Sequence, residues 1–161
     1  VEMLNRQVPG PQGERRLPAL PVRVDASIDA YVPQQYVGSE ALRIDIHRRL
    51  ALAEGDDELR ELRAALEDRY GPLPEPIEHL FAIQEAKIKV AQLGADYLVF
   101  RGGKATVGRL VLGSQELAEL RSRIHTAVYT VGNREVSLRG DDGFPQALRL
   151  VDAILEARRA A

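Results

Sequence analysis

The sequence has no cysteine and no long apolar run. Without cysteine the chain can form neither disulfides nor zinc sites built from thiolates. The lack of disulfides gives weak support for a location inside the cell. No stretch approaches the roughly 18 uninterrupted apolar residues of a membrane span. The first ten residues, VEMLNRQVPG, lack the basic start and apolar core of a signal peptide. We therefore expect a chain without membrane association.

Charge of one sign is not in excess either. The 161 residues include 22 Lys and Arg against 24 Asp and Glu, a net charge of −2. A domain whose main role is to bind DNA usually carries a basic surplus, so this balance argues against that role. The apolar and charged fractions, 45% and 29%, are ordinary for a globular protein, and the length suffices for one domain with its own core.

Residues 1–21 differ in composition from the rest of the chain. They read as the end of a helix followed by the connector PGPQGERRLPALP, whose prolines, glycines and charges are typical of a linker. The sequence also begins without Met. We therefore expect the chain to be a piece of a longer protein, with a linker and helix remnant at residues 1–19 and the domain itself at residues 20–161.

The first half of that domain is predicted to be a strand and three helices. The strand is VRVDASI (22–28), which alternates and is rich in β-branched residues. The helices cover 39–55, 56–71 and 74–94, with Ser39 and Asp56 as N-caps, Pro76 in a first turn, and Gly55, Gly71 and Gly94 as stops. The first has one apolar face, Leu42, Ile46 and Leu50. The third helix has two apolar faces, so it is expected at the centre of the domain. One face holds Ile77, Leu80, Phe81, Ile88 and Ala91, and the other holds Ile83, Ala86, Val90 and Leu93.

The second half changes to hairpins. Residues 95–112 read as two strands around Gly102-Gly103, and 126–140 as two strands around Gly132-Asn133. A short helix is predicted at 114–124 and a terminal helix at 144–159, with Leu148, Val151 and Leu155 apolar. An N-terminal layer of about three helices followed by β-hairpins, a short helix and a C-terminal helix predicts an α+β fold.

Residues suited to catalysis or metal binding are not grouped in the sequence. The three histidines, His47, His79 and His125, include no pair at i, i+3 or i+4. RGGK (101–104) lacks the spacing and the strand-to-helix context of a P-loop, and GDDELRE (55–61) lacks the alternation of a calcium loop. No serine lies in a nucleophile elbow. We expect no catalytic residue, metal site or cofactor site in this chain, and an independent enzyme is the least favoured of three hypotheses.

The helix at 56–71 carries an acidic stripe beside an apolar one. At about 100° per residue, its apolar residues fall within about 80° of each other, namely Leu59, Leu62, Leu66 and Tyr70. A second stripe holds Asp57, Glu58, Glu61, Ala65 and Asp68, with Arg69 at the seam. This second stripe is either a solvated face or a docking surface for a basic partner, where charge would set register and specificity. A different hypothesis is a nucleic-acid-binding module that uses the basic hairpin residues Arg101, Lys104, Arg109, Arg134 and Arg139.

The run LEDRYGPLPEPIEHLFAIQEAKIKVAQLG (66–94) resembles the C-terminal (TRCF) domain of bacterial transcription-repair coupling factors, the Mfd family. Its match lies in Leu66, Asp68, Arg69, Tyr70, Gly71 and Pro74, and upstream in Ala30, Tyr31, Pro33, Tyr36 and Arg43. The resemblance covers residues 20–100 well and is loose beyond them. Two positions depart from the family pattern, since Ala65 stands where a Glu is usual and His47 where a Tyr is common.

The resemblance implies a regulatory role. In this family the parent protein is an ATP-dependent DNA translocase, similar to superfamily 2 helicases, which displaces stalled RNA polymerase and recruits UvrA for transcription-coupled nucleotide excision repair. The C-terminal domain packs on the N-terminal UvrB-like module and masks the surface that UvrA uses. The implied location is the bacterial cytoplasm, and ATP and Mg²⁺ would belong to the parent motor. In this chain the implied partner-binding residues are Glu58, Glu61, Asp68 and Arg69.

Overall fold

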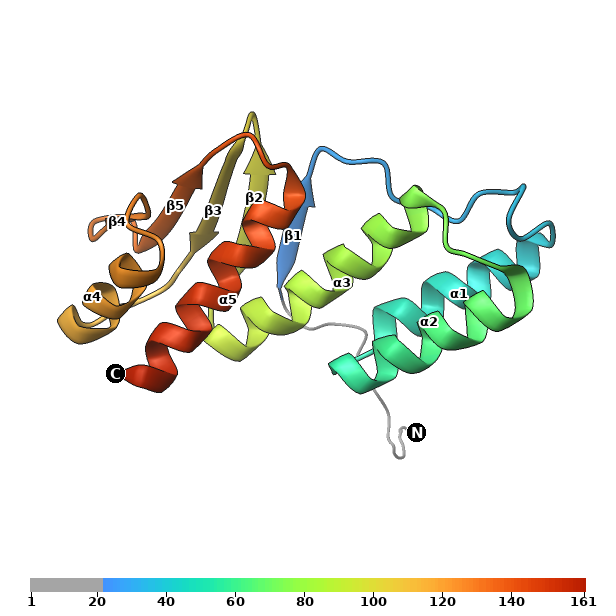
Figure 1. Cartoon of the computed structure of the whole chain (residues 1–161), viewed down its shortest axis with the longest axis horizontal. Helices are drawn as coiled ribbons and strands as arrows, with labels where there is room; N and C mark the ends of the chain where they lie inside the picture. Colours follow the sequence, from blue (N-terminus) through green and yellow to red (C-terminus); the bar gives the residue numbers. More distant parts are fainter. Residues whose placement is uncertain (1–21) are drawn as a thin grey trace, which may run out of the picture.

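The computed structural model describes residues 22–161, so the predicted linker at 1–19 lies outside the described residues (Figure 1). In chain order the elements are β1 (Arg23–Ala26), α1 (Glu40–Leu52), α2 (Asp56–Tyr70), α3 (Glu75–Leu93), β2 (Tyr97–Arg101), β3 (Lys104–Gly108), α4 (Ser114–Arg123), β4 (Val128–Thr130), β5 (Glu135–Arg139) and α5 (Phe144–Ala160). Figure 1 shows the strands with α4 and α5 at one end of an elongated molecule and α1 with α2 at the other. The predicted α+β class is confirmed.

The five strands form one mixed sheet in the order β1-β2-β3-β5-β4. Both predicted hairpins are present, β2 with β3 and β4 with β5, and Gly102 and Gly103 make the first turn with positive φ, +57° and +74°. β1 pairs in parallel with β2, although three helices separate them in the chain. One face of the sheet is buried against α3 and α5, while Tyr97, Val99, Thr106 and Ser137 alternate onto the other face.

Helix α3 belongs to two separate hydrophobic clusters. Its Ile77, Phe81 and Ile88 pack with the apolar residues of α1 and α2, a group that we call the helical cluster. Its Ala86 and Val90 pack with the sheet, α4 and α5, a group that we call the sheet cluster. The predicted two-sided helix at the centre of the domain is therefore confirmed, and α3 joins the two ends of the molecule.

Three predicted helix details are corrected. Helix α1 ends at Leu52 because Ala53 takes an extended conformation, so Gly55 does not stop it. Gly55 instead is the N-cap of α2, and Asp56, predicted to cap that helix, is its first residue. Leu42, placed on the buried face of α1, is 36% exposed, whereas Ile46 and Leu50 are buried. Ser39 caps α1 as predicted, since its Oγ accepts a hydrogen bond from the Leu42 N–H at 3.3 Å.

Helix α5 is buried over a wider surface than the sequence predicts. Of the three residues expected on its apolar face, Val151 is fully buried, and Leu148 and Leu155 are half-buried. The fully buried side also contains Phe144, Gln146, Ala147, Leu150, Ala153, Ile154 and Ala157. This width follows from the position of α5, which contacts α3, α4 and the sheet at once.

Candidate protein-interaction site

Helix α2 has the two stripes that its sequence predicts. Leu59, Leu62 and Leu66 are buried in the helical cluster, and Tyr70 packs at its edge. Because these residues fix the rotation of the helix, the neighbouring acidic stripe faces solvent, with Glu61 and Asp68 exposed. Asp57, also exposed, forms an ion pair with Arg60 one turn further along the same helix.

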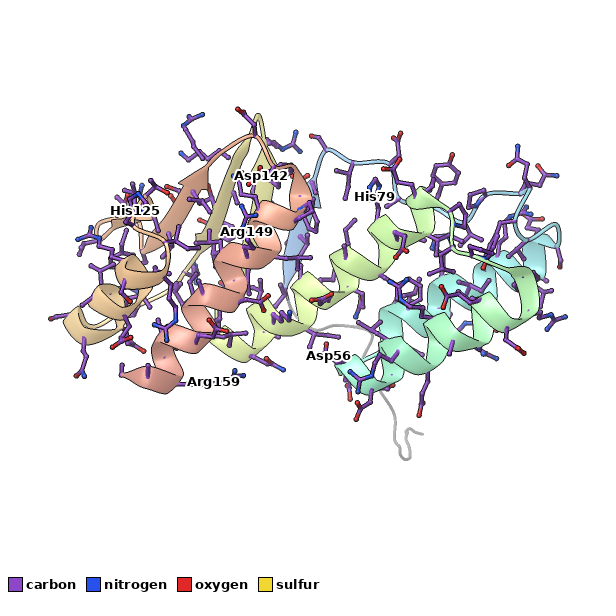
Figure 2. The ribbon with its side chains drawn as sticks, viewed as in Figure 1. Asp56, His79, His125, Asp142, Arg149 and Arg159 are labelled. Carbon is purple, nitrogen blue, oxygen red and sulfur yellow. The ribbon has the colours of Figure 1, made fainter. Side chains whose placement is uncertain are left out.

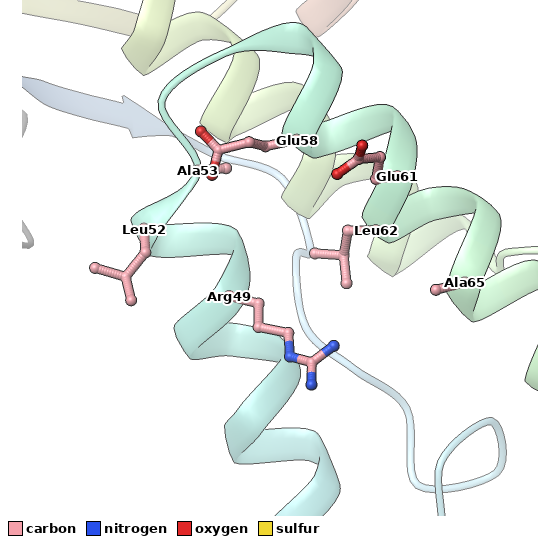
Figure 3. A pocket seen from close by; sticks show the side chains of 7 residues that line it. All are labelled: Arg49, Leu52, Ala53, Glu58, Glu61, Leu62 and Ala65. Atoms are coloured by element: carbon pink, nitrogen blue, oxygen red, sulfur yellow. The ribbon is translucent and has the colours of Figure 1, made fainter.

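A groove runs between α1 and α2, next to the acidic stripe. Its first part has a volume of about 320 Å³ and is lined by Arg49, Leu52, Ala53, Glu58, Glu61, Leu62 and Ala65 (Figure 3). A second part, of about 130 Å³, continues toward Asp45, Arg69 and Tyr70, and shares Arg49, Leu62 and Ala65 with the first. Figure 3 shows Glu58 and Glu61 extending from α2 toward α1, and Arg49 extending from α1 toward α2.

The structure brings three of the four predicted partner-binding residues to this groove. Glu58 and Glu61 line its first part, and Arg69 lines its second part with its guanidinium 5.4 Å from the centre of the Tyr70 ring. The Glu58 carboxylate also accepts a hydrogen bond from the Glu54 N–H at 3.0 Å. Asp68 is exposed on the same stripe but does not line the groove. Neither Glu61 nor Asp68 forms an ion pair with another residue in the range 22–161.

The opposite wall of the groove was missed by sequence reasoning. It comes from α1 and includes Leu52 and Arg49, whose Nε lies 3.0 Å from an oxygen of Asp45 on its own helix. Which residues of α1 face α2 depends on how the two helices pack, and a single helical wheel does not contain that information. The one usable signal was the small Ala65 within the acidic stripe, because a small side chain between two helices leaves space above the buried leucines.

Several residues of the family motif meet in space and have structural roles. The Tyr36 hydroxyl donates to the backbone oxygens of Leu66 and Gly71, at 3.2 and 2.7 Å, and so satisfies carbonyls at the C-terminal end of α2. The Tyr36 ring also lies 5.4 Å from that of Tyr70. Burial raises the pKa of the Tyr36 phenol, and Glu67 and Tyr70 add to the effect.

Arg43 has a comparable structural role at the start of α1. Its guanidinium donates to the carbonyls of Val37 and Gly38, at 2.8 and 3.0 Å, and holds the turn that carries Tyr36. The motif therefore divides into residues that hold α1 and α2 in place and two residues, Asp68 and Arg69, that are exposed to solvent.

The basic hairpin residues do not form one patch. The sheet register places Arg101, Lys104 and Arg139 side by side at one end of their strands. The other two cations flank the opposite end, Arg109 after β3 and Arg134 before β5. Five residues of extended chain separate the two groups, or roughly 16 Å at about 3.3 Å per residue. Arg101 donates two hydrogen bonds to Asp25 and Arg109 pairs with Asp96, so the charges are divided and partly neutralised.

The histidines are far apart. Figure 2 shows His79 near the start of α3 and His125 beyond α4, while His47 is exposed on α1. The Nδ1 atom of His79 lies 2.5 Å from the Asp29 carbonyl oxygen. Within residues 22–161, no three His, Cys, Asp or Glu side chains are grouped in a way that could hold a metal ion. In that same range, no helix has the length and apolar character required to cross a membrane.

Comparison with known proteins identifies relatives of the first part of the domain in sequence and of its fold in structure. The family model described as TRCF domain matches residues 26–110. The transcription-repair-coupling factor of Mycobacterium bovis is 42% identical over 67 residues, which is 42% of this chain, and that of Bacillus subtilis is 27% identical over 111 residues, or 69% of this chain. These alignments span only 5% and 9% of the relatives' own lengths.

A solved structure has the same fold. The crystal structure of the C-terminal domain of a transcription-repair coupling factor superposes with a TM-score of 0.70 at 18% sequence identity, covering 86% of this chain and 96% of the other. At this identity the likeness concerns the fold.

Proposed function

The chain belongs to the TRCF domain family, and from this premise we propose that it is the regulatory C-terminal domain of a transcription-repair coupling factor. It acts as an intramolecular lid. In the closed state it packs on the N-terminal UvrB-like module of the same protein and masks the surface that UvrA would use. The α2 surface formed by Glu58, Glu61, Asp68 and Arg69 makes the contact.

One observation carries this proposal. Glu61 and Asp68 are exposed, have no ion pair among residues 22–161, and lie beside a groove with an apolar floor. Unpaired carboxylates next to an accessible apolar surface suit a basic partner that also contributes apolar contacts. The other acidic residue of the stripe that faces outward, Asp57, is already paired with Arg60.

Weak contacts are sufficient for a lid of this kind. A rim charge pair contributes about 0.2–1 kcal/mol. Tethering within one chain raises the effective concentration of the lid to roughly millimolar, so even a weak interface is closed most of the time. Opening then shifts a population between two states and does not require a permanent interface to be broken.

The activity of the parent protein is part of the same proposal. The parent would be an ATP-dependent DNA translocase of the bacterial cytoplasm that displaces stalled RNA polymerase and recruits UvrA for nucleotide excision repair. ATP and Mg²⁺ would bind its motor region, and this chain would contribute no catalytic group. RNA polymerase and DNA would contact other parts of the parent.

The test is calorimetric titration of the 161-residue chain with the UvrB-like module of its parent, with and without UvrA. We expect the chain and UvrA to compete for the module. Reversing the two unpaired charges, Glu61→Arg with Asp68→Arg, is expected to weaken binding at least tenfold. The control is Glu67→Arg, which reverses one charge on the same helix at an exposed position outside the stripe.

Two results would contradict the proposal in different ways. Simultaneous binding of the chain and UvrA to the module would exclude masking. Equal affinity of the double variant and the Glu67→Arg control would show that the acidic stripe is only a solvated face.

A further inference from the structure

We infer that the groove between α1 and α2 receives one face of an amphipathic helix of the partner, whose basic end meets Glu58 and Glu61. This inference rests on the proposed function and adds the shape and chemistry of the partner. The carboxylates alone would suit any basic surface. The groove restricts the partner further, because only a partner with protruding side chains can fill the space between α1 and α2.

The floor of the groove is apolar and its length is that of a short helix. Leu62 forms the floor of both parts, together with Leu52 in the first and Leu66 in the second. From Glu58 to Arg69 the groove follows α2 for 11 residues, or roughly 16 Å at 1.5 Å per residue. A helix laid along it would make about three turns and would insert side chains at i, i+4 and i+7. A volume of about 320 Å³ holds such side chains but not a helix backbone.

Ala65 is the residue that keeps the groove open. It lines both parts, it is exposed, and it lies one helical turn after Glu61 and Leu62. A long side chain at this position would extend over Leu62 and divide the groove. The stripe has one charged side chain fewer as a result, but the half-buried Leu52 and the edge of Leu62, which is 9% exposed, stay open to the partner.

The charges along the groove give the partner helix a direction. Glu58 and Glu61 lie at the end near the α1–α2 turn, and Arg69 lies at the other end, close to Tyr70. Arg49, in the middle, is already paired with Asp45. A partner helix with Lys or Arg at one end and a neutral or acidic residue at the other therefore fits in one orientation only, because the reverse orientation places like charges together.

The experiment compares two tryptophan substitutions. Ala65→Trp fills the groove without changing any charge. Ala64→Trp is the matched control, since Ala64 is also exposed on α2 but lines neither part of the groove. Both variants and Glu61→Arg are titrated into the UvrB-like module by calorimetry, and circular dichroism checks that each is folded. We expect Ala65→Trp to weaken binding at least tenfold and Ala64→Trp to change it less than twofold.

The outcomes separate this inference from the proposed function. If the wild-type chain binds the module and Ala65→Trp binds as well as Ala64→Trp, the groove is not used, and the inference is overturned while the lid stands. If Ala65→Trp abolishes binding and Glu61→Arg does not, the groove stands and the charged contact is wrong. If the wild-type chain does not bind the module at all, the proposed function fails and the inference fails with it.

Discussion

At the residue scale, Tyr36 joins the turn before α1 to the end of α2. Its hydroxyl is shared by the carbonyls of Leu66 and Gly71. Tyr36→Phe keeps the ring contact with Tyr70 and removes both hydrogen bonds, so we expect a loss of about 0.5–1.5 kcal/mol in the free energy of unfolding. Urea denaturation measures this change. The control is Tyr31→Phe, on a ring that is 51% exposed, and a loss as large for Tyr31 would refute the assignment.

The same tyrosine predicts a pH effect. Burial raises the pKa of Tyr36 in the folded state, so folding favours the protonated phenol. The stabilisation is fully present below the unfolded pKa of about 10 and is lost as the pH rises through the higher folded value. We expect the difference in unfolding free energy between the wild type and Tyr36→Phe to shrink above about pH 10. A difference that grows with pH would mean that the phenolate is the form stabilised by folding.

Gly108 lies under the Tyr97 ring on the open face of the sheet. A Cβ atom at position 108 would fall inside that ring, which is held by a hydrogen bond from the Tyr97 hydroxyl to Glu135. Gly108→Ala must displace the ring, and we expect a destabilisation of about 1–3 kcal/mol by thermal or urea denaturation. Gly132→Ala is the control, because nothing lies within 4 Å of its added Cβ atom. Similar effects at the two positions would rule out the clash as the cause.

At the element scale, Gln84 links α3 to the α1–α2 hairpin, which is the pair of helices joined by residues 53–55. It is buried, and its Nε2 donates to the Ala53 carbonyl at the end of α1 at 2.9 Å. Gln84→Leu leaves that buried carbonyl without a donor, and we expect a cost of about 1–3 kcal/mol. Gln92→Leu, an exposed position on the same helix, serves as the control. Equal midpoints for the two variants in urea denaturation would contradict this role.

The elements themselves were largely predictable, because their signals are local. Ser39, Gly71 and Gly94 marked helix ends correctly, and the spacing of apolar residues on α3 showed both of its packed faces. The mistakes at Gly55 and Asp56 occurred where two helices follow each other closely, since a glycine between them can end one or begin the next. The parallel pairing of β1 with β2 was not predictable, because it joins strands about 70 residues apart and depends on how α3 packs.

The candidate site was only half predictable for the same reason. The rotation of α2 follows from its own leucines, so the exposure of Glu61 and Asp68 could be derived from one helix. The groove needs two helices, and the contribution of Arg49 and Leu52 depends on their packing. The split of the five hairpin cations between two ends of the sheet likewise depends on strand register, which fixes Lys104 opposite both Arg101 and Arg139.

At the scale of the whole molecule, α3 makes the domain one mechanical unit. It contributes buried residues to both clusters, so the α1–α2 hairpin and the sheet pack on one continuous helix of 19 residues. The proposed lid would use this property, because the contact surface on α2 would then move together with the sheet. The Gln84 hydrogen bond joins α3 to the end of α1, and the Tyr36 hydroxyl joins the turn before α1 to the end of α2.

In the proposed lid, the tether between this chain and the module would set how strongly UvrA binding is suppressed. The ratio of closed to open parent equals the effective concentration of the lid divided by its dissociation constant in trans. At an effective concentration of roughly 1 mM, a trans dissociation constant of about 10 μM leaves about 1% of the parent open. Removing this chain from the parent is then expected to tighten UvrA binding about 100-fold. Titration of UvrA into the full-length and truncated parent measures the gain.

The affinity of the separate chain for the module predicts the size of that gain in UvrA affinity. The calorimetric titration of the separate chain and the UvrA titration of the parent therefore check each other. The double charge reversal, Glu61→Arg with Asp68→Arg, placed in the full-length parent is expected to tighten UvrA binding by about ninefold or more without truncation, because a tenfold weaker closed state lowers the closed-to-open ratio from about 100 to about 10. Glu67→Arg in the same background controls for a general effect of charge. A truncated parent that binds UvrA no more tightly than the full-length protein would show that this domain does not mask the site, whatever its affinity in trans.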